Sequence, residues 1–195
     1  YEVREFVSDV IGEKYLIPLI GVWNSVEEID LQQLPNQFVL KCTHDSASVV
    51  ICKDKTDFDY EDAKKKLSEA MHINYFYYSR EWPYKDIKPR IIAEKYITDE
   101  SGTELKDYKI YCLNGHPQLI QVDFGRFVKH ERNLYTTNWQ YIDQVIEYPS
   151  NHNVQIKKPE NLQEMLFLSQ VLATKIGCPS IRTDFYSCGN KIYFG

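Results

Sequence analysis

The sequence lacks an apolar run long enough to cross a membrane. The longest such run, residues 16–22, is interrupted by Pro18 and Gly21 and falls well short of the roughly 20 residues that a spanning helix needs. No charged-then-apolar leader is visible, so we predict no secretory signal. The five cysteines are an odd number without a Cys-x-x-Cys pair. A disulfide framework and a structural zinc site are therefore both unexpected, and a reducing cytoplasm fits best.

An excess of basic charge is also lacking. The chain has 23 Lys and Arg against 28 Asp and Glu, a formal net charge of −5. This argues against a nucleic-acid binder that works by general attraction to phosphates, but it leaves room for a local cationic cleft. The 195 residues suit one large domain or two small lobes that share a cleft. The aromatic content of 14% favours strands and ring-lined clefts.

The ends of the chain lie inside predicted structure. It begins at Tyr1 without a methionine and stops at Gly195 within a predicted strand. We therefore expect a piece of a longer protein, with both termini incomplete.

Hydrophobic spacing predicts a mixture of helices and strands. Helical spacing is found over residues 2–11, 25–34, 59–73 and 161–176. Strand-like segments are found over residues 16–23, 37–42, 48–53, 90–97, 105–113, 116–123, 181–187 and 191–194. Asn114-Gly115 predicts a tight hairpin, and Cys188-Gly189-Asn190 a second one. Residues 125–159 carry no assignment, and the antiparallel pattern with few helices indicates an α+β fold.

Lys41 ends a predicted strand and precedes a loop of small polar residues, 43–48. A lysine placed in this way can hold phosphate oxygens while backbone N–H groups close over them. A solvated lysine before a turn is the commoner explanation of the pattern taken alone, because the Walker pattern is absent.

Two further charged pairs end or occupy predicted strands. Glu94 and Lys95 follow three apolar residues, which by itself indicates a strand leaving the core. Arg182 and Asp184 are two apart and share one face of a strand. Burying both is costly unless they pair or meet a ligand, so a structural ion pair and a phosphate-plus-Mg²⁺ site are equally compatible with the pattern.

The segment from Asp123 to Arg132 is locally basic, with Arg126, Lys129 and His130 between them. An anionic substrate site and a solvated loop both fit this pattern. The aromatic segment around residue 82 is typical of core packing rather than of a sugar platform. Cys42 has no neighbouring arrangement that would make it a nucleophile.

Taken together in this order, these sequence segments resemble the TupA-like (teichuronopeptide-biosynthesis) ATP-grasp family of bacterial surface-polysaccharide gene clusters. The matching stretches run from end to end: YEVREFV (1–7), LPNQFVLKCTHDSASVVICKDK (34–55), REWPYKDIKPRIIAEKYI (80–97), DYKIYCLNG (107–115), QVDFGRF (121–127) with RNLY (132–135), and IRTDFYSCGNKIYFG (181–195). The resemblance implies an α+β ATP-grasp fold, whose two lobes enclose ATP in a cleft. We expect residues 1–97 to form the smaller lobe and residues 98–195 the larger one.

For the phosphates, the resemblance implies two cations and a lid. Arg4 stands where the family has a basic residue for the phosphates, and Lys41 matches the strand lysine that contacts the α- and β-phosphates. The loop with His44, Ser46 and Ser48 matches the lid over the triphosphate.

For the nucleoside, the resemblance implies one hinge and one ribose contact. Glu94 would accept from the adenine amino group, and Lys95, Tyr96 and Ile97 would supply the hinge backbone contacts. Asp107 matches the acidic residue that holds the ribose hydroxyls.

For the reaction, the resemblance implies Mg²⁺ and three side chains. Arg182 matches the arginine at the transferring phosphoryl group, Asp184 the first Mg²⁺ carboxylate, and Arg126 a γ-phosphate contact. Fixed cations and Mg²⁺ would offset the negative charge that builds up when a carboxylate is phosphorylated.

Two positions depart from the family pattern. The lid loop has Ala47 and no glycine, which limits positive φ and close backbone approach. The second metal carboxylate of the family falls just beyond Gly195, so the residues given do not complete the metal site.

The resemblance implies an ADP-forming ligase that joins an amino acid to a uronic-acid-bearing saccharide through an acyl phosphate. It also implies a cytoplasmic protein with peripheral attachment to a membrane polysaccharide assembly system, and no nucleic-acid partner. Two alternatives stay open: a polysaccharide glycosyltransferase, and a degenerate ATP-grasp module that binds without turnover.

Overall fold

The computed structural model describes residues 1–46, 48–102, 104–126, 128–154 and 156–195. Ala47, the lid position discussed above, lies outside the described residues. The chain divides into two compact units: unit 1 comprises Tyr1 and Pro18–Tyr96, and unit 2 comprises Glu2–Ile17 and Ile97–Gly195. Residues 2–17 thus group with unit 2, whereas we expect them, from the sequence, in the first lobe.

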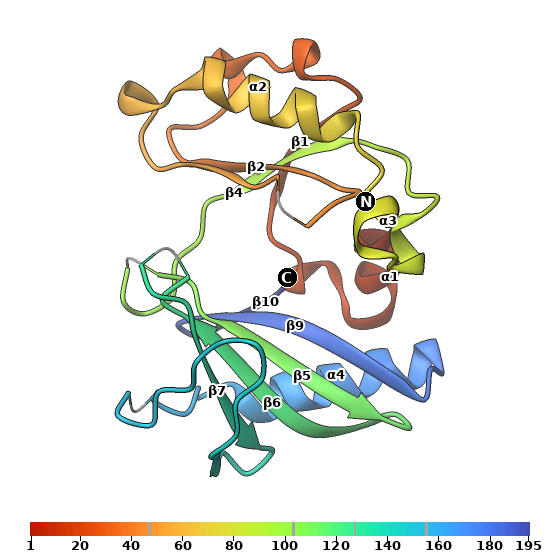
Figure 1. Cartoon of the computed structure of the whole chain (residues 1–195), viewed down its shortest axis with the longest axis vertical. Helices are drawn as coiled ribbons and strands as arrows, with labels where there is room; N and C mark the ends of the chain where they lie inside the picture. The colour runs from red at the N-terminus through yellow and green to blue at the C-terminus, as the bar shows by residue number, and fades with distance from the viewer. Residues whose placement is uncertain (47, 103, 127, 155) are drawn as a thin grey trace. The chain divides into compact units, whose positions relative to one another are not determined.

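Unit 1 is built on a four-stranded antiparallel sheet in the order β1-β4-β2-β3 (Figure 1). Its strands are β1 (Leu19–Trp23), β2 (Phe38–Cys42), β3 (Val50–Cys52) and β4 (Ile91–Lys95). In β2, Phe38, Leu40 and Cys42 are buried and alternate with half-buried residues. This period-two pattern turns one face of the sheet toward the core and leaves the other for polar side chains.

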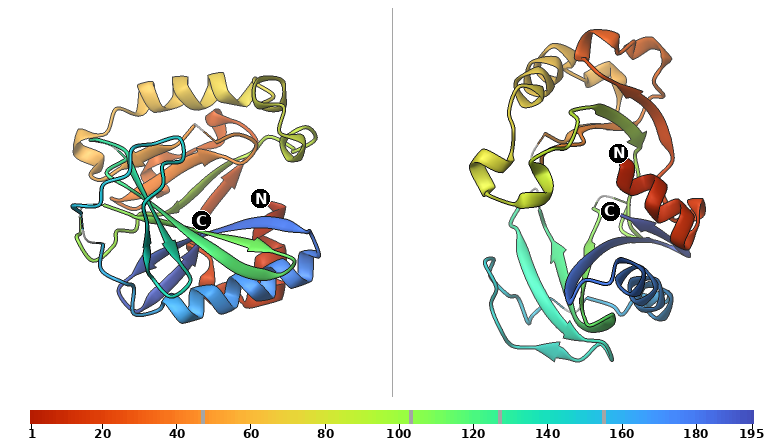
Figure 2. Two further views of the ribbon diagram at one scale, coloured as in Figure 1. Left: turned by 60° about the horizontal axis from the view of Figure 1, so that its bottom comes forward. Right: turned by 90° about the vertical axis from the view of Figure 1, so that its right-hand side faces the viewer.

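Helix α2 (Tyr60–Met71) covers the apolar face of this sheet (Figures 1 and 2). The helix begins where the Asp59 side chain accepts from the backbone N–H of Asp62, an N-cap. Ala63, Leu67 and Ala70 recur at helical spacing and are buried against the strands.

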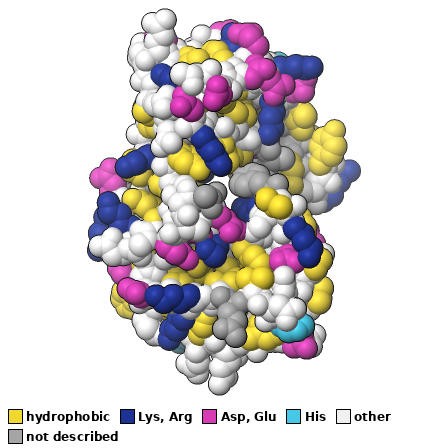
Figure 3. All heavy atoms as spheres, turned by 90° about the vertical axis from the view of Figure 1, so that its left-hand side faces the viewer, with side chains coloured by type: hydrophobic (Ala, Val, Ile, Leu, Met, Phe, Trp, Pro, Cys, Tyr) yellow, Lys and Arg dark blue, Asp and Glu magenta, His cyan; other side chains and the backbone are white. Residues whose placement is uncertain are grey.

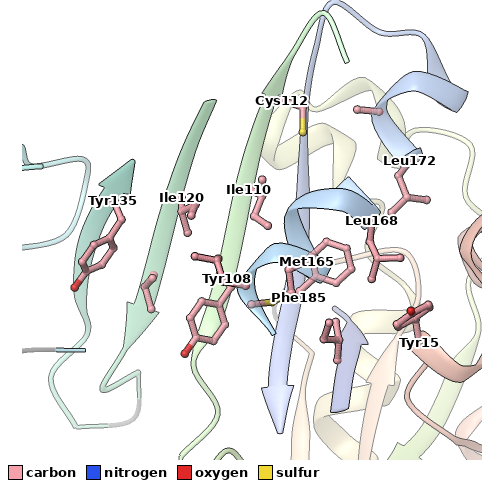
Figure 4. Close-up of a cluster of buried hydrophobic side chains, with 14 of the residues drawn as sticks. Tyr15, Tyr108, Ile110, Cys112, Ile120, Tyr135, Met165, Leu168, Leu172 and Phe185 are labelled. Carbon is pink, nitrogen blue, oxygen red and sulfur yellow. The ribbon is translucent and has the colours of Figure 1, made fainter. Parts of the chain in front are cut away.

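Unit 2 is built on a six-stranded antiparallel sheet in the order β10-β9-β5-β6-β7-β8. Its strands are β5 (Asp107–Leu113), β6 (His116–Phe124), β7 (Glu131–Thr136), β8 (Tyr141–Ile142), β9 (Ser180–Cys188) and β10 (Lys191–Phe194). Helix α4 (Leu162–Ile176) lies along one face (Figure 2). Figure 4 shows the core that this creates, with Ile110, Met165 and Phe185 fully buried between strands and helix.

Helix α1 (Glu2–Ile11) belongs to unit 2 for a packing reason. Its Val7 is 1% exposed and lies in the same core as Leu168 and Leu172 of α4. Tyr15, in the short turn η1 (Glu13–Tyr15), is also part of this core. The segment therefore packs where its apolar side chains are buried, whatever its place in the sequence.

Both predicted hairpins are present. The turn at Asn114-Gly115 joins β5 and β6, with φ of 49° and 83° at its two residues, the left-handed region that Asn and Gly tolerate. Gly189, with φ 63°, lies in the turn between β9 and β10.

The prediction of one helix over residues 25–34 is wrong. The segment forms two separate 3₁₀ turns, η2 (Val26–Glu28) and η3 (Leu31–Gln33). Glu28 accepts from the backbone N–H of Asn24, and Asp30 caps the second turn. The cap at Asp30 therefore starts a second turn in place of a continuous helix.

The remaining described elements are short. They are η4 (Lys55–Asp57), α3 (Phe76–Ser79) and η5 (Trp82–Tyr84). Strands β7 and β8 lie in the segment that the sequence left unassigned. Two antiparallel sheets with few helices confirm the predicted α+β class. In the part of the chain that is described, no helix is long and apolar enough to cross a membrane.

Candidate functional site

The central strands of unit 2 carry charged side chains on the face opposite α4. Strand β5 alternates between Asp107 and Lys109 on this face and buried apolar residues on the other. Lys109 pairs in register with Asp184 of β9, and Asp107 pairs with Asp123 of β6. Three neighbouring strands thus bring four charged residues together.

Lys109 is the centre of this group. Its Nζ lies 3.0 Å from Asp184 Oδ2, 3.1 Å from Asp107 Oδ2 and 3.9 Å from Asp123 Oδ2. The lysine side chain is only 11% exposed. A buried ammonium ion needs such partners to offset the loss of hydration.

Each of the three carboxylates also meets an arginine. Asp184 accepts from Arg182 Nε at 2.7 Å and from its Nη2 at 3.0 Å. The Arg126 Nη1 atom lies 2.5 Å from Asp107 Oδ2. Asp123 is paired with a third arginine, Arg132. We call this group the charged network; its members are Asp107, Asp123, Asp184, Lys109, Arg126, Arg132 and Arg182.

The third arginine, Arg132 of β7, is the most buried. Its Nε lies 2.6 Å from Asp123 Oδ1, and its Nη2 lies 3.2 Å from Asp123 Oδ2. Burial by itself raises the pKa of the Asp123 carboxyl, but the hydrogen bonds and charge of Arg132, together with Lys109, hold that pKa below its ordinary value.

Arg182 is held in the same way. Burial opposes its charge, but the hydrogen bonds and charge of Asp184 raise the pKa of the Arg182 guanidinium above its ordinary value. Its side chain is nevertheless 47% exposed. The ion pair that the sequence left as one of two alternatives is therefore formed, and the cation still reaches the surface.

Asp107 has an unused acceptor. The residue is 2% exposed, and its Oδ1 atom is buried without a hydrogen-bond partner among the described residues. Burial and the nearby charge of Asp107 raise the pKa of Tyr186 well above its ordinary value, so this phenol stays protonated. A buried, unpaired carboxylate oxygen fits a donor such as a ribose hydroxyl.

A Mg²⁺ ion fits these residues poorly. Asp184 Oδ1 already accepts from Arg182, and its Oδ2 accepts from Lys109 and Arg182. Among the described residues, no group of three His, Cys, Asp or Glu is arranged to hold a metal ion. The described donor set does not make a magnesium site.

Unit 1 has its own charged pair on the face opposite α2. Lys41 of β2 pairs in register with Ile92 of β4. Glu94 is two residues further along β4, so its side chain lies on the same face of the sheet as that of Lys41. The Lys41 Nζ lies 2.7 Å from Glu94 Oε2, and the two side chains are 31% and 6% exposed. Two residues that the sequence singled out separately are thus in direct contact.

The predicted hinge residues follow Glu94 directly. Lys95 is exposed at the end of β4, and its backbone N–H donates to the carbonyl of Pro18 at 2.9 Å. Tyr96 and Ile97, both half-buried, are the residues between which the two units divide.

Buried side chains of the loop after β2 hold it in place. His44 is 2% exposed, and its Nε2 lies 3.0 Å from the carbonyl oxygen of Ala70 in α2. Ser48 is also buried and donates to Asp45 at 2.6 Å, while the exposed Ser46 donates to Tyr75 at 2.9 Å. In this structure His44 and Ser48 anchor the loop, and Ser46 is the predicted lid residue on the surface.

Arg4 lies on α1 in unit 2. Its Nη2 donates to the carbonyl of Ile17 at 2.6 Å. Through this bond the side chain ties α1 to the end of the segment that follows it.

The locally basic stretch resolves into separate roles. Lys129 is exposed beside Glu131, with 2.8 Å between their charged atoms. His130 stacks on Tyr148 with 3.7 Å between ring centroids, and Arg132 lies 4.8 Å over the same ring. Neither a plain solvated loop nor a uniform anion site describes this segment.

Sequence reasoning missed Lys109 of the charged network and Gln121 beside it. Gln121 donates to Asp123 and accepts from the Tyr111 hydroxyl at 2.8 Å. The period-two alternation of strand β5, with charges at 107 and 109, was the available signal. On the face shown in Figure 3, basic and acidic side chains alternate among hydrophobic ones, with no broad patch of one sign in its coloured part.

Two antiparallel sheets, each with an apolar face under a helix and a charged opposite face, are the architecture of the ATP-grasp fold. The fold is shared with solved structures of low sequence identity. A D-alanine–D-alanine ligase from Bacillus anthracis is 15% identical, with a TM-score of 0.53 over 100% of this chain and 53% of that one. An L-amino acid ligase from Bacillus licheniformis is 12% identical, with a TM-score of 0.52 over 98% of this chain and 41% of that one.

The sequence itself shows the family. The model of the TupA-like ATPgrasp family matches residues 1–195, and the chain belongs to this family. The B. anthracis ligase complexed with ATP is 14% identical, with a TM-score of 0.50 over 98% of this chain and 51% of that one. The chain thus spans about half the length of these solved ligases. No curated protein sequence matches it.

Proposed function

We propose that this protein is an ATP-dependent ligase that joins a carboxylate to an amine through an acyl phosphate. Membership of the TupA-like ATP-grasp family supports this, as does a fold shared with ligases for D-alanine and for L-amino acids. The observation that carries the proposal is the chain of contacts Arg182–Asp184–Lys109–Asp107–Arg126. It joins four side chains that the resemblance assigns to the nucleotide and the reacting phosphate.

In unit 1, the proposal assigns the phosphates and the base. Lys41, which is 31% exposed, binds the α- and β-phosphates as a point charge. Glu94 accepts from the adenine amino group, and Tyr96 and Ile97 supply backbone contacts to the ring. Ser46 is the lid residue best placed to reach a phosphate, because its side chain is exposed.

In unit 2, the proposal assigns the ribose and the transferred phosphate. The unpaired Asp107 Oδ1 accepts from a ribose hydroxyl. Arg182 and Arg126, whose side chains are 47% and 44% exposed, stabilise the transferring phosphoryl group. Arg4 contributes a further positive charge from α1. Mg²⁺ would enter with ATP, whose phosphates bring further oxygen ligands, and Asp184 would hold it only by giving up a hydrogen bond from Arg182 or Lys109.

The reaction has two balanced steps. An oxygen of the substrate carboxylate forms a bond to the γ-phosphorus while the bond to the ADP oxygen breaks. The substrate amine then attacks the acyl carbon, inorganic phosphate leaves, and the amine loses a proton. The products are ADP, phosphate and an amide, and the fixed arginines offset the charge that develops in the first step.

We propose that one substrate is an amino acid. The other is a uronic acid of a bacterial surface polysaccharide, which supplies the carboxyl group. A peripheral place at the inner face of the membrane, beside a polysaccharide assembly system, belongs to this proposal. Family membership is what supports it.

The test uses the intact natural protein. Calorimetry with Mg-ATP measures binding, and release of ADP and phosphate measures turnover with glucuronate oligomers and an amino acid as co-substrates. Asp184→Asn and Lys41→Met should each lower turnover by about 100-fold or more, because Lys41→Met removes a fixed positive charge at the phosphates and Asp184→Asn removes the carboxylate that orients Arg182 and Lys109. Asp143→Asn, at an exposed position of unit 2, is the matched control.

Other outcomes would overturn the proposal. Release of UDP or GDP from nucleotide sugars without use of ATP would identify a glycosyltransferase. ATP binding without turnover across carboxylate and amine substrates would identify a binding module.

A further inference from the structure

One ammonium group lies among three carboxylates in unit 2. Lys109 Nζ donates to Asp107 at 3.1 Å and to Asp184 at 3.0 Å, and it lies 3.9 Å from Asp123 Oδ2. The lysine comes from the middle of β5, between β6 and β9, so the backbone fixes its place among them. A converging set of carboxylates around one positive group is the arrangement expected around a bound cation.

The carboxylates of the network are all paired with cations without a metal ion. Each carboxylate lies between Lys109 and its own arginine: Arg126 for Asp107, Arg132 for Asp123 and Arg182 for Asp184. Four cations thus face three carboxylates. A divalent ion added here would meet the repulsion of all four and would have to displace a hydrogen bond from every oxygen that it used except Asp107 Oδ1.

Lys109 and a divalent ion also compete for the same space. Mg²⁺ requires carboxylate oxygens at about 2.1 Å in near-octahedral geometry. The Asp184 Oδ2 atom is instead held 3.0 Å from Nζ, and Asp184 Oδ1 is held by Arg182. The ion can reach Asp184 only if it brings other oxygen ligands and negative charge with it.

We infer that Lys109 is a positioning residue that takes the place of a cation among Asp107, Asp123 and Asp184, so that unit 2 binds no free divalent cation. Resting on the proposed function, this means that the metal reaches Asp184 only together with the phosphates of ATP. Lys109 thereby keeps Asp184 and Asp107 oriented while the site waits for nucleotide.

A purely structural role for Lys109 makes a different prediction. If the lysine only tied β5 to its neighbours, its removal would lower stability and leave the affinity for metal ions unchanged. Metal binding in the absence of nucleotide therefore separates the two roles.

The experiment titrates nucleotide-free protein with Mn²⁺ and follows the free ion by electron paramagnetic resonance. Wild type should show no Mn²⁺ binding that depends on Asp184, and Lys109→Met should bind Mn²⁺ at least about tenfold more tightly than the weakest binding that the titration detects. The double variant Lys109→Met with Asp184→Asn should lose this gain. Lys109→Arg, which keeps the positive charge, should behave as wild type.

The matched control is Lys106→Met. Lys106 is another largely buried lysine of unit 2, 15% exposed and paired with Asp99 at 2.5 Å and with Glu100 at 3.2 Å. Its removal leaves Lys109 in place, so Mn²⁺ affinity should not change.

Two results would overturn the inference. The first is a folded Lys109→Met protein, by circular dichroism, with the wild-type affinity for Mn²⁺. The second is Mn²⁺ binding by nucleotide-free wild type that Asp184→Asn abolishes. If Lys109→Met does not fold, Lys109→Gln undergoes the same titration with the same criteria. Absence of ATP binding in separate calorimetry would refute the proposed function without touching this result.

Discussion

Lys41 and Glu94 lie diagonally across two neighbouring strands of unit 1, with 2.7 Å between Nζ and Oε2. The carboxylate is 6% exposed and the lysine 31%, so the cation covers the acid on its solvent side. Under the proposed function these two residues serve different parts of ATP, the phosphates and the adenine. Their direct contact means that a change in either one alters the other.

Replacing Lys41 by Met should lower ATP affinity about tenfold or more, since one phosphate contact to a fixed charge is lost. It should also lower the free energy of unfolding by about 1–3 kcal/mol, because the largely buried Glu94 loses a paired cation. Adding Glu94→Gln should restore most of the stability and none of the affinity. Calorimetry with ATP and urea denaturation measure the two effects.

The exposed Lys65→Met of α2 is the control for removal of a lysine, and it should change neither quantity. Wild-type ATP affinity in the double variant would show that the pair has a purely structural role.

Asp123 and Arg132 should make stability depend on pH. The folded-state pKa of Asp123 lies below its unfolded value of about 3.9, because the bonds and charge of Arg132 outweigh the effect of burial. The stabilisation is therefore fully present above the unfolded pKa and is lost as pH falls through the folded pKa. We expect a constant unfolding free energy from neutral pH down to about pH 5, and a decline below about pH 4.

Asp123→Asn should lower the unfolding free energy at neutral pH by about 3 kcal/mol, because it leaves the buried Arg132 with only the exposed Glu147 as a carboxylate partner. It should also flatten the acidic decline. Urea denaturation at a series of pH values measures both, with Asp143→Asn as the exposed control. An unchanged acidic slope would show that other carboxylates dominate it.

Local patterns predicted much of the fold. The Asn-Gly turn between β5 and β6 and the apolar spacing of α2 and α4 are written in short stretches of sequence, and the structure contains all three. Strand β7 could not be predicted, because the structure buries both its faces together with their charged side chains, as it does for Arg132 against Asp123. Its charged side chains therefore look like those of a loop.

The charged network shows the same limit at the candidate site. Arg182 and Asp184 share a face by simple alternation, which the sequence reveals. Lys109 joins them only because β5 pairs with β9 in the register Lys109 to Asp184, over a separation of 75 residues. No local pattern encodes that register, so the central residue of the network was missed.

The cysteines should differ sharply in reactivity. Burial raises the pKa of the Cys42 thiol to about 11 and that of Cys112 to about 11, so very little thiolate is present near pH 8. Cys178 is exposed. Native protein with a disulfide reagent should therefore release one rapid burst from Cys178, and Cys178→Ser should abolish it. Equal labelling rates at Cys42 and Cys178, measured by peptide mass spectrometry, would contradict this.

His44 should contribute to stability, which separates it from the other predicted lid residues. The ring is 2% exposed and its Nε2 bonds the Ala70 carbonyl at 3.0 Å, so His44→Ala creates a cavity and leaves that carbonyl without this partner. We expect a loss of about 2–3 kcal/mol in unfolding free energy. Ser46→Ala removes only an exposed bond to Tyr75 and should cost less than about 0.5 kcal/mol.

Urea denaturation of the two variants tests this contrast, and calorimetry with ATP adds the functional part. If the lid acts through Ser46, Ser46→Ala should weaken ATP binding while leaving the denaturation midpoint almost unchanged. His44→Ala should shift the midpoint first, and any loss of ATP affinity should follow from loosening of the loop that His44 ties to α2. Equal midpoints for both variants would show that the buried imidazole does not anchor the loop, and the lid role of His44 would then have to rest on direct contact with the phosphates.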